Sequence, residues 1–203
     1  MGLEYVAAFP KAVRGYVHMD GLISQPLSQD AIFAAAGEWV KRDALSESAE
    51  RRARGKRLAP FVDYGPKLPP GTQRLLSAMQ FAMSLPELYY ADLKQQAAYQ
   101  AKIIAALKAY KVPESVLYAN EPGIALAQND GYATRDAQSL FPKITVPTLI
   151  LNGNQDGVIP PEHARLAAKG ISGARLELLD RCGHFPFVEQ PEKTTQAILK
   201  LVG

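Results

Sequence analysis

Cysteine is nearly absent from this chain of 203 residues, which contains Cys182 alone. A single cysteine excludes an internal disulfide and is typical of a reducing compartment, and we expect a small buried thiol here rather than a nucleophile. No apolar run approaches the length of a membrane span, and the first residues show no basic segment followed by an apolar one. Short repeats and low-complexity tracts are also missing. We therefore expect a soluble, cytoplasmic protein without a membrane partner.

Two kinds of binding site also lack support in the sequence. The three histidines and one cysteine show no metal-ligand spacing, so we expect neither a metal ion nor another cofactor. Basic residues are concentrated in one stretch with a helical pattern, which carries Arg51, Arg52, Arg54, Lys56 and Arg57. A nucleic-acid site would need interleaved aromatic residues or a recognisable binding module, and neither accompanies this stretch. We interpret it as a solvated helix face and expect no nucleic-acid partner.

The chain does contain enough apolar sequence for one core. Hydrophobic residues make up 47% of the chain, which fits one domain with a smaller helical insertion. The N-terminal part predicts a helix over residues 3–9 and a buried strand over residues 13–19 that ends at Asp20-Gly21. Because no capping residue precedes that helix, we expect the chain to begin inside an element, after a strand that is missing.

The middle of the chain, from about residue 28 to residue 136, is rich in alanine and predicts helices. Ser28 is a suitable N-cap for a first helix, whose apolar residues recur at spacings of three and four. Proline and glycine are too frequent in residues 60–71 for a regular element. Further helices are predicted over residues 72–84 and 92–110, and the tyrosines between them, at positions 89 and 90, could line a pocket.

The last part of the chain alternates between strand and helix. Residues 148–151 form an apolar run typical of a buried parallel strand, and the turn NGNQDG follows it. A helix is predicted from Pro161 to Lys169, a strand over residues 175–179 and a last helix from Pro191. Short connections between alternating strands and helices predict right-handed crossovers and a parallel sheet.

Two polar residues follow neighbouring strands of this predicted sheet. Asp156 comes after the first strand and His184 after the second. Because functional loops gather at the carboxyl ends of parallel strands, we expect the two side chains to meet at one edge of the sheet. A carboxylate there can accept the Nδ1 proton of the imidazole, while the other ring nitrogen takes a proton from a nucleophile. The sequence therefore predicts an acid and a base for hydrolysis.

The sequence also allows purely structural roles for these two residues and for other polar residues. Asp156 could be a turn aspartate, and His184 could be a hydrogen-bonded loop histidine. Asp20 also ends a strand, where a turn or capping role is favoured. His18 and His163 are expected to be structural or exposed rather than catalytic.

The segments PTLILNGNQDGVIPPEHA and LELLDRCGHFPFVEQPE resemble the C-terminal part of the α/β-hydrolase fold family, with the acid turn, helix, last strand and histidine loop in order. The resemblance implies that Asp156 is the acid and His184 the base of a catalytic triad in the family order of serine, acid and histidine. It also implies an α/β fold with parallel strands, flanking helices and an inserted helical cap. Residues 1–27 and 141–203 would belong to the hydrolase core, and residues 28–140 to the cap.

The segment GLEYVAAFPKAVRGYVHMDG is similar to the helix that follows the family's nucleophile elbow and to the next strand. The elbow has the form G-x-S-x-G, and this chain contains no such motif. The resemblance therefore implies that the chain is the later part of a family member, with the serine upstream of Met1. The strand over residues 13–19 would then have an exposed edge, which could pair with another copy to form an oligomer.

Within the family, the position of the cap and the segments GLEYVAAFP and GHFPFVEQPE look most like the prolyl iminopeptidase-like branch. This resemblance implies an aminopeptidase for a small molecule or short peptide, with Glu87, Asp92 or Glu121 as candidates to hold the substrate's amino group. Esterase activity and epoxide opening stay open, because the identity of the nucleophile would distinguish them. A rival from another class is a non-catalytic, truncated hydrolase relative that acts as a binding module.

Overall fold

The computed structural model of the protein describes residues 2–109 and 130–203, apart from the side chains of residues 100, 102–104, 106–108 and 130. Three strands form one parallel sheet in the order β1-β2-β3, with β1 at Tyr16–Met19, β2 at Thr148–Gly153 and β3 at Arg175–Leu179. The prediction of a parallel sheet is therefore confirmed, and β3 has the predicted bounds.

Helices make up most of the remaining structure. The α-helices are α1 (Gly2–Ala8), α2 (Gln25–Ala44), α3 (Ala49–Val62), α4 (Thr72–Ser84), α5 (Lys94–Ala109), α8 (Asp130–Ala133), α9 (Pro161–Gly170), α10 (Pro186–Glu189) and α11 (Pro191–Val202). The 3₁₀ helices are η1 (Pro10–Ala12), η2 (Gly65–Lys67), η3 (Pro86–Leu88) and η4 (Gln138–Lys143). Within the described ranges, no helix is long and apolar enough to cross a bilayer.

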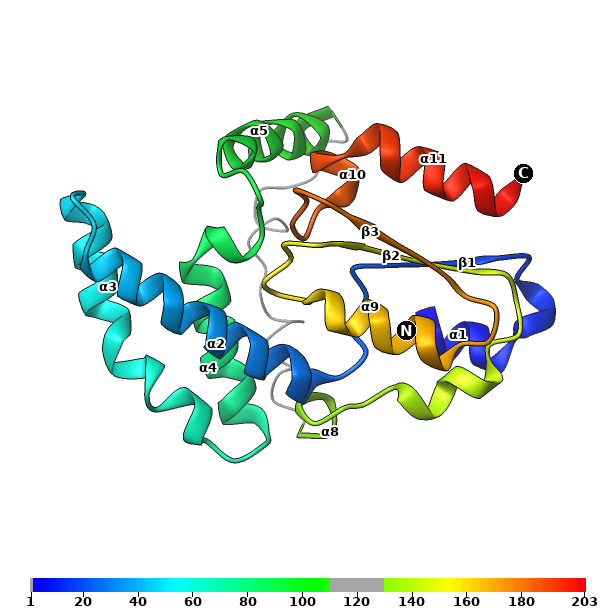
Figure 1. The fold of residues 1–203 in the computed structure, drawn as a ribbon, viewed down its shortest axis with the longest axis horizontal. Coiled ribbons are helices and arrows are strands. Elements are labelled where there is room, and N and C mark those ends of the chain that lie inside the picture. The colour runs from blue at the N-terminus through cyan, green and yellow to red at the C-terminus, as the bar shows by residue number, and fades with distance from the viewer. Residues whose placement is uncertain (1, 110–129) are drawn as a thin grey trace.

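The central strand β2 packs against helices on both of its faces. All of its residues are buried, and successive side chains of a strand point to opposite faces. Leu149 and Leu151 pack on the side of α11, whereas Ile150 packs on the side of α1 and α9. Figure 1 shows this arrangement, with α1 and α9 below the sheet and α11 above it. Because both faces are covered, the strand is a continuous apolar run rather than an alternating one.

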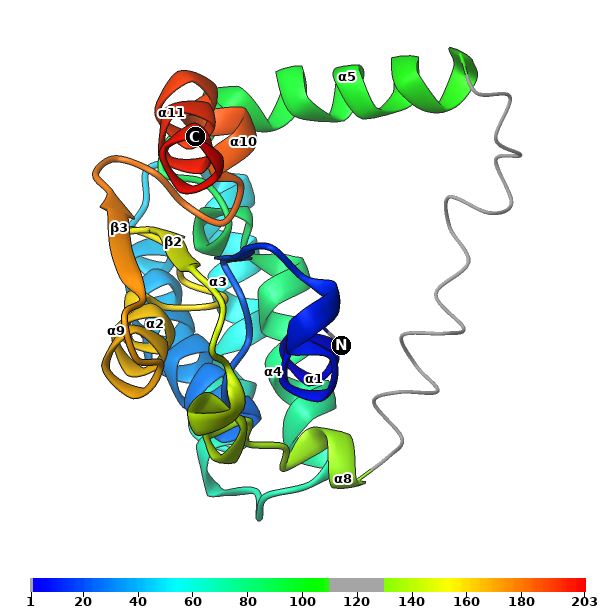
Figure 2. The same cartoon turned by 90° about the vertical axis from the view of Figure 1, so that its right-hand side faces the viewer.

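The helices α2, α3 and α4, which lie between β1 and β2 in the chain, gather beyond one end of the sheet (Figure 1). Figure 1 shows α2, α3 and α4 to the left of the sheet, and α2 packs against both of the others. Their apolar residues form a separate core that includes Phe33, Leu58 and Phe81. In Figure 2, α5 lies beside α10 and α11, where Tyr99 stacks on Phe185. The boundaries of the cap at residues 28 and 140 stay a prediction.

Two predictions for this region are wrong in their details. The helix α2 begins directly after Ser24 and has a proline in its first turn, so Ser28 is not its N-cap. The hydroxyl of Ser28 instead donates a hydrogen bond to the carbonyl of Val158 at 2.6 Å. The helix α3 continues through Pro60, although residues 60–71 were predicted to contain no regular element. A proline in the last turn of a helix removes only one backbone hydrogen bond there, so the helix persists.

The basic stretch on α3 is only partly the predicted solvated face. Arg52 and its neighbours Lys56 and Arg57 are exposed. The side chain of Arg54, in contrast, is 16% exposed and reaches both Asp43 on α2, at 2.5 Å, and Glu87 on η3, at 2.6 Å. Burial of a carboxylate is costly unless it is paired, and the side chain of Asp43 is fully buried. This ion network therefore turns one arginine inward and links three elements.

The first strand is shorter than predicted. Residues 10–12 form η1, with Pro10 at its start, so β1 begins at Tyr16 rather than at residue 13. Among the described residues, β1 pairs with β2 alone and forms one edge of the sheet. An oligomer through this edge stays a prediction.

Candidate active site

The three strands end on the same side of the sheet, next to α2 and α4 (Figure 1). Asp20 directly follows β1, Asp156 lies in the loop after β2, and His184 lies in the loop after β3. In a parallel sheet, loops at the carboxyl ends of adjacent strands lie side by side. The structure therefore brings the two predicted residues, Asp156 and His184, together, and adds Asp20 to them.

Asp156 and His184 form a hydrogen-bonded pair. Nδ1 of His184 lies 2.7 Å from Oδ2 of Asp156. The side chain of Asp156 is fully buried, whereas 22% of the His184 side chain is exposed. Oδ1 of Asp156 accepts the backbone N–H groups of Val158 at 2.8 Å and Ile159 at 2.9 Å, which fixes the carboxylate. Because the carboxylate only accepts, Nδ1 of the neutral imidazole carries the proton and Nε2 is the acceptor.

The surroundings of His184 favour its protonated form. Burial alone would lower the pKa of the imidazole, because a charge loses its hydration. The hydrogen bond to Asp156 and the negative charges of Asp156 and Glu189 outweigh that effect, so the pKa of His184 lies above the ordinary histidine value. The imidazole can therefore take up a proton readily and hold it as an ion pair with Asp156.

Two glycines let the loops of this site approach closely. A Cβ on Gly183 would overlap the carbonyl oxygen of Tyr89, and a Cβ on Gly153 would overlap the carbonyl oxygen of Gly183. The backbone N–H of His184 donates to the Tyr89 carbonyl at 2.6 Å. The Tyr89 ring packs edge-on against the imidazole, with 5.7 Å between the ring centroids. The imidazole is therefore held between Asp156 and a tyrosine of the helical region.

Asp20 has more than the turn or capping role that the sequence favoured. Its φ of +41° is unusual for a residue other than glycine, and its Oδ1 accepts the N–H of Gly153 at 3.0 Å. The side chain also lines the same cavity as His184. Burial, with the nearby charge of Asp156, raises the pKa of Asp20 to about 8. Asp20 is therefore mainly a neutral acid at pH 7. Its position after a strand was visible in the sequence, but its burial was not.

His184 and Asp20 line a cavity of about 400 Å³. Most of its described lining is apolar and comes from Leu22, Ile32, Leu75, Ala78, Met79, Ala82, Met83, Val158 and Ile159. The polar lining residues are Gln25, Ser28, Gln29, Tyr89 and Tyr132. A mainly apolar cavity with a few polar groups is the usual form of a small-molecule site.

The remaining histidines and the cysteine lie away from this cavity. His18, His163 and Cys182 are all buried, and none of them lines it. Burial and the nearby carboxylates raise the pKa of Cys182 to about 12, so its thiol is not activated at neutral pH. Nδ1 of His163 accepts the backbone N–H of Ile23 at 3.0 Å, which is a structural contact. In the described parts of the chain, no cluster of three or more suitable side chains could hold a metal ion.

Of the three carboxylates that were candidates for an amino-group site, Glu87 and Asp92 do not line the described cavity. Glu87 is paired with Arg54. Asp92 is exposed and accepts the backbone N–H of Lys94 at 3.0 Å. Glu121 lies outside the described residues. Among the described lining residues, only Asp20 therefore carries a carboxyl group.

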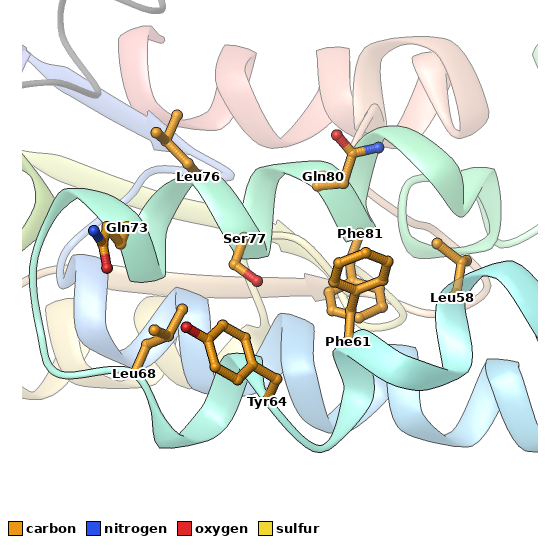
Figure 3. Close-up of a pocket in the computed structure, with 9 residues that line it drawn as sticks. All are labelled: Leu58, Phe61, Tyr64, Leu68, Gln73, Leu76, Ser77, Gln80 and Phe81. Atoms are coloured by element: carbon orange, nitrogen blue, oxygen red, sulfur yellow. The ribbon is translucent and has the colours of Figure 1, made fainter.

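A second hollow, of about 420 Å³, lies between α3 and α4 (Figure 3). Phe61, Tyr64 and Leu68 form one side of it, and Leu76 and Gln80 of α4 form part of the other. None of the nine residues that line it is an acid, a base or a cysteine. This hollow therefore offers no general acid or base at neutral pH, and the candidate chemistry belongs to the cavity of His184.

Known proteins match this chain over different lengths. A family model described as alpha/beta hydrolase fold matches residues 1–191. Among curated proteins, monoacylglycerol lipase ABHD6 of Mus musculus is 44% identical over 57 residues, which are 28% of this chain and 17% of the lipase. A pimeloyl-[acyl-carrier protein] methyl ester esterase of Neisseria meningitidis is 32% identical over 63 residues, which are 31% of this chain and 25% of the esterase.

Solved structures show a similar arrangement of elements. A proline iminopeptidase-related protein of Thermus thermophilus aligns over 98% of this chain and 60% of its own, with a TM-score of 0.66 and 20% identity. The proline iminopeptidase of Mycobacterium smegmatis aligns over the same shares, with a TM-score of 0.59 and 16% identity. The chain thus spans less than two thirds of the length of these relatives, and at such identities the likeness concerns the fold alone. Because the family model matches most of the sequence and the sheet and helices agree with it, the chain belongs to the α/β-hydrolase fold family.

Proposed function

We propose that this chain supplies the acid and the base of a hydrolase for carboxylic esters with an apolar group. Asp156 is the acid, His184 is the base, and a nucleophile from outside these 203 residues completes the triad. The proposal depends mainly on one observation, the 2.7 Å contact between Nδ1 of His184 and Oδ2 of Asp156 beside a mainly apolar cavity.

In this mechanism, Nε2 of His184 takes the proton of the nucleophile while the nucleophile's oxygen bonds to the substrate's carbonyl carbon. The electron pair of the carbonyl bond moves onto the carbonyl oxygen. The imidazolium then gives its proton to the leaving alcohol as the ester bond breaks, and an acyl-enzyme remains. Water repeats both steps and releases the acid. Asp156 keeps Nδ1 protonated and stabilises the imidazolium throughout.

The cavity lining favours an ester over a peptide with a free amino group. An ammonium group needs a carboxylate partner, and Asp20 is the one carboxyl group among the described lining residues. Burial and the charge of Asp156 raise its pKa to about 8, so ionising Asp20 to pair with an ammonium group at pH 7 carries an additional cost. An apolar acyl chain, in contrast, gains about 0.8 kcal/mol for each buried CH₂ group. The local similarity to a lipase and to a methyl ester esterase supports the same choice.

The nucleophile is proposed to come from elsewhere because the chain has no G-x-S-x-G motif. A serine in that role gives the ester hydrolysis described above. An aspartate would instead form an ester intermediate with an epoxide, so epoxide opening is the outcome that would reassign the nucleophile.

The experiment compares the 203-residue chain with the protein encoded by the complete reading frame around it. Both are assayed with p-nitrophenyl acetate, p-nitrophenyl octanoate, proline p-nitroanilide and styrene oxide. We expect the complete protein to hydrolyse the octanoate with a higher kcat/KM than the acetate, and the other two substrates at a much lower rate. The 203-residue chain should be inactive with all four.

Three other results would change the proposed substrate, the proposed nucleophile or the proposed function. A higher kcat/KM for the proline anilide would replace the ester proposal by the aminopeptidase hypothesis. Turnover by the 203-residue chain that is lost in His184→Ala would contradict the external nucleophile, but not the hydrolase assignment. A folded complete protein without turnover on any substrate would favour a non-catalytic binding module.

A further inference from the structure

Glu189 is a buried carboxylate that contacts the backbone on both sides of His184. It is the last residue of α10, and 8% of its surface is exposed. Its Oε1 accepts the N–H of Gly183 at 2.9 Å and, more weakly, the N–H of Phe185 at 3.4 Å. Its Oε2 accepts the N–H of Ala91 at 2.9 Å. One side chain therefore joins the histidine loop to the segment between η3 and α5.

His184 is bound to the same segment by its own backbone and ring. Its N–H donates to the carbonyl of Tyr89 at 2.6 Å, and its ring packs against the Tyr89 ring. The ring of Tyr90 lies 5.1 Å from that of Phe185, the residue after the histidine. Residues 89–91 therefore contact the histidine loop at His184 and Phe185 directly, and at Gly183 through the side chain of Glu189.

Among the residues that the structure describes, the carboxylate at position 189 accepts hydrogen bonds but has no cationic partner. Within the described part of the chain, Glu189 forms no ion pair, so backbone amides alone compensate its charge. Three N–H donors point at its two oxygens. A glutamine has one oxygen and one NH₂ group, so it would place a donor against the N–H of Gly183 or Ala91. The site therefore specifically needs a group that only accepts.

We infer that Glu189 is a positioning residue, which holds His184 against Asp156 by fastening the histidine loop to residues 89–91. The inference rests on the proposed role of His184 as the base. It adds that the base is held in place from the helical region as well as from the sheet. A shift of residues 89–91 would therefore move the imidazole relative to the substrate.

The test uses the complete protein and compares Glu189→Gln with Glu192→Gln, which changes an exposed carboxylate at the start of α11. The measurements are amide hydrogen exchange at Gly183 and Ala91, NMR titration of the His184 ring, kcat and KM. We expect Glu189→Gln to speed exchange at one or both amides and to lower the His184 titration midpoint, because a nearby negative charge is lost. We also expect kcat to fall roughly 10- to 100-fold with little change in KM, as for a misplaced catalytic group.

The control variant Glu192→Gln should match the wild type in every measurement. The inference is overturned if Glu189→Gln also shows wild-type exchange and a wild-type His184 midpoint, whatever its kcat. If the complete protein hydrolyses no ester but exchange and titration change as expected, the proposed function fails and the positioning of His184 by Glu189 is upheld.

A second variant covers the case in which Glu189→Gln does not fold. Glu189→Asp keeps the charge but is one CH₂ group too short to reach all three amides. It should keep the His184 midpoint near the wild-type value while losing kcat and exchange protection at Gly183 or Ala91. Wild-type exchange protection in Glu189→Asp would overturn the inference.

Discussion

Asp156 binds two backbone amides with Oδ1 and His184 with Oδ2. Asn at this position keeps the size of the side chain but removes the negative charge that raises the pKa of His184. We expect Asp156→Asn to lower the His184 titration midpoint measured by NMR. In the complete protein we expect kcat to fall by about 10⁴-fold, as when another triad loses its acid. Asp180→Asn, at an exposed turn, is the matched control. An unchanged midpoint in Asp156→Asn would contradict the charged pair.

His163 gives the folded protein a sensitivity to acid. Burial, with the nearby charge of His18, lowers the pKa of His163 from 6.5 to about 4. The unfolded chain therefore binds this proton near pH 6.5 and the folded protein does not, so stability is full above pH 6.5 and falls as the pH approaches 4. The loss is on the order of 3 kcal/mol.

The variant His163→Asn keeps an acceptor for the N–H of Ile23 but cannot titrate. We expect its free energy of unfolding, measured in urea between pH 7 and pH 4, to depend less on pH than that of the wild type. The difference between the two curves removes the contribution of the carboxylates, which titrate in both proteins. Parallel curves would contradict the assignment of this acid sensitivity to His163.

Gly183 is needed because the backbone of Tyr89 lies where its Cβ would be. We expect Gly183→Ala to force the histidine loop away from residue 89 and to lower the free energy of unfolding by about 1–3 kcal/mol, as in other overpacked sites. Gly37→Ala is the control, since its Cβ would meet Val62 at an ordinary 3.5 Å in the middle of a helix. Thermal unfolding compares the two. A Gly183→Ala protein as stable as the control would show that the close approach is not required.

At the scale of single residues, the position of a side chain could be predicted from the sequence where it depends only on the strand that the residue follows. Asp156 and His184 follow adjacent parallel strands, and that alone predicts that they meet. The raised pKa of Asp20 depends on its burial and on the charge of Asp156, neither of which is visible in a local pattern. The contact between Glu189 and Ala91 joins positions far apart in the chain, so it could not be predicted from a local sequence pattern.

The elements of the helical region are joined by the ion network around Asp43. This fully buried carboxylate accepts hydrogen bonds from Arg51 and Arg54, and Arg54 continues to Glu87. Asp43→Ala leaves Arg54 paired with Glu87 and Arg51 partly exposed, so the loss is smaller than for an isolated buried pair. We therefore expect Asp43→Ala to destabilise the protein by about 1–3 kcal/mol, measured by urea unfolding. Glu38→Ala breaks an exposed pair with Lys41 and should have little effect. Equal effects of the two variants would contradict the network's role.

At the scale of elements, helices with strong local signals were predicted closely. The range of α4 agrees with the prediction, and α11 begins at Pro191 as expected. The ends of elements that depend on tertiary contacts were predicted less closely. Ser28 has the sequence of an N-cap, but its hydroxyl binds the carbonyl of Val158 from another part of the fold. The inward turn of Arg54 likewise depends on a buried partner on another helix.

At the scale of the whole molecule, alternation of strands and helices was enough to predict the parallel sheet, because such connections allow few topologies. Tyr89 was a predicted pocket residue and lines the cavity of His184, but most of that cavity was not predicted. Its walls come mainly from α2 and α4, and the way in which amphipathic helices pack over a sheet is not encoded in their periodicity. The mainly apolar lining of that cavity supports an ester rather than a peptide as the proposed substrate.

The most direct test of the account is the kcat/KM of the complete protein for p-nitrophenyl octanoate with and without the imidazole of His184. The account predicts that His184→Ala lowers kcat/KM by about 10³-fold or more. Its unfolding temperature is measured alongside, because loss of the imidazole leaves the buried carboxylate of Asp156 without its partner, and kcat/KM is compared only for folded protein. A folded His184→Ala protein that keeps kcat/KM within about tenfold of the wild type would contradict the claim that His184 and Asp156 are the base and acid of a hydrolase.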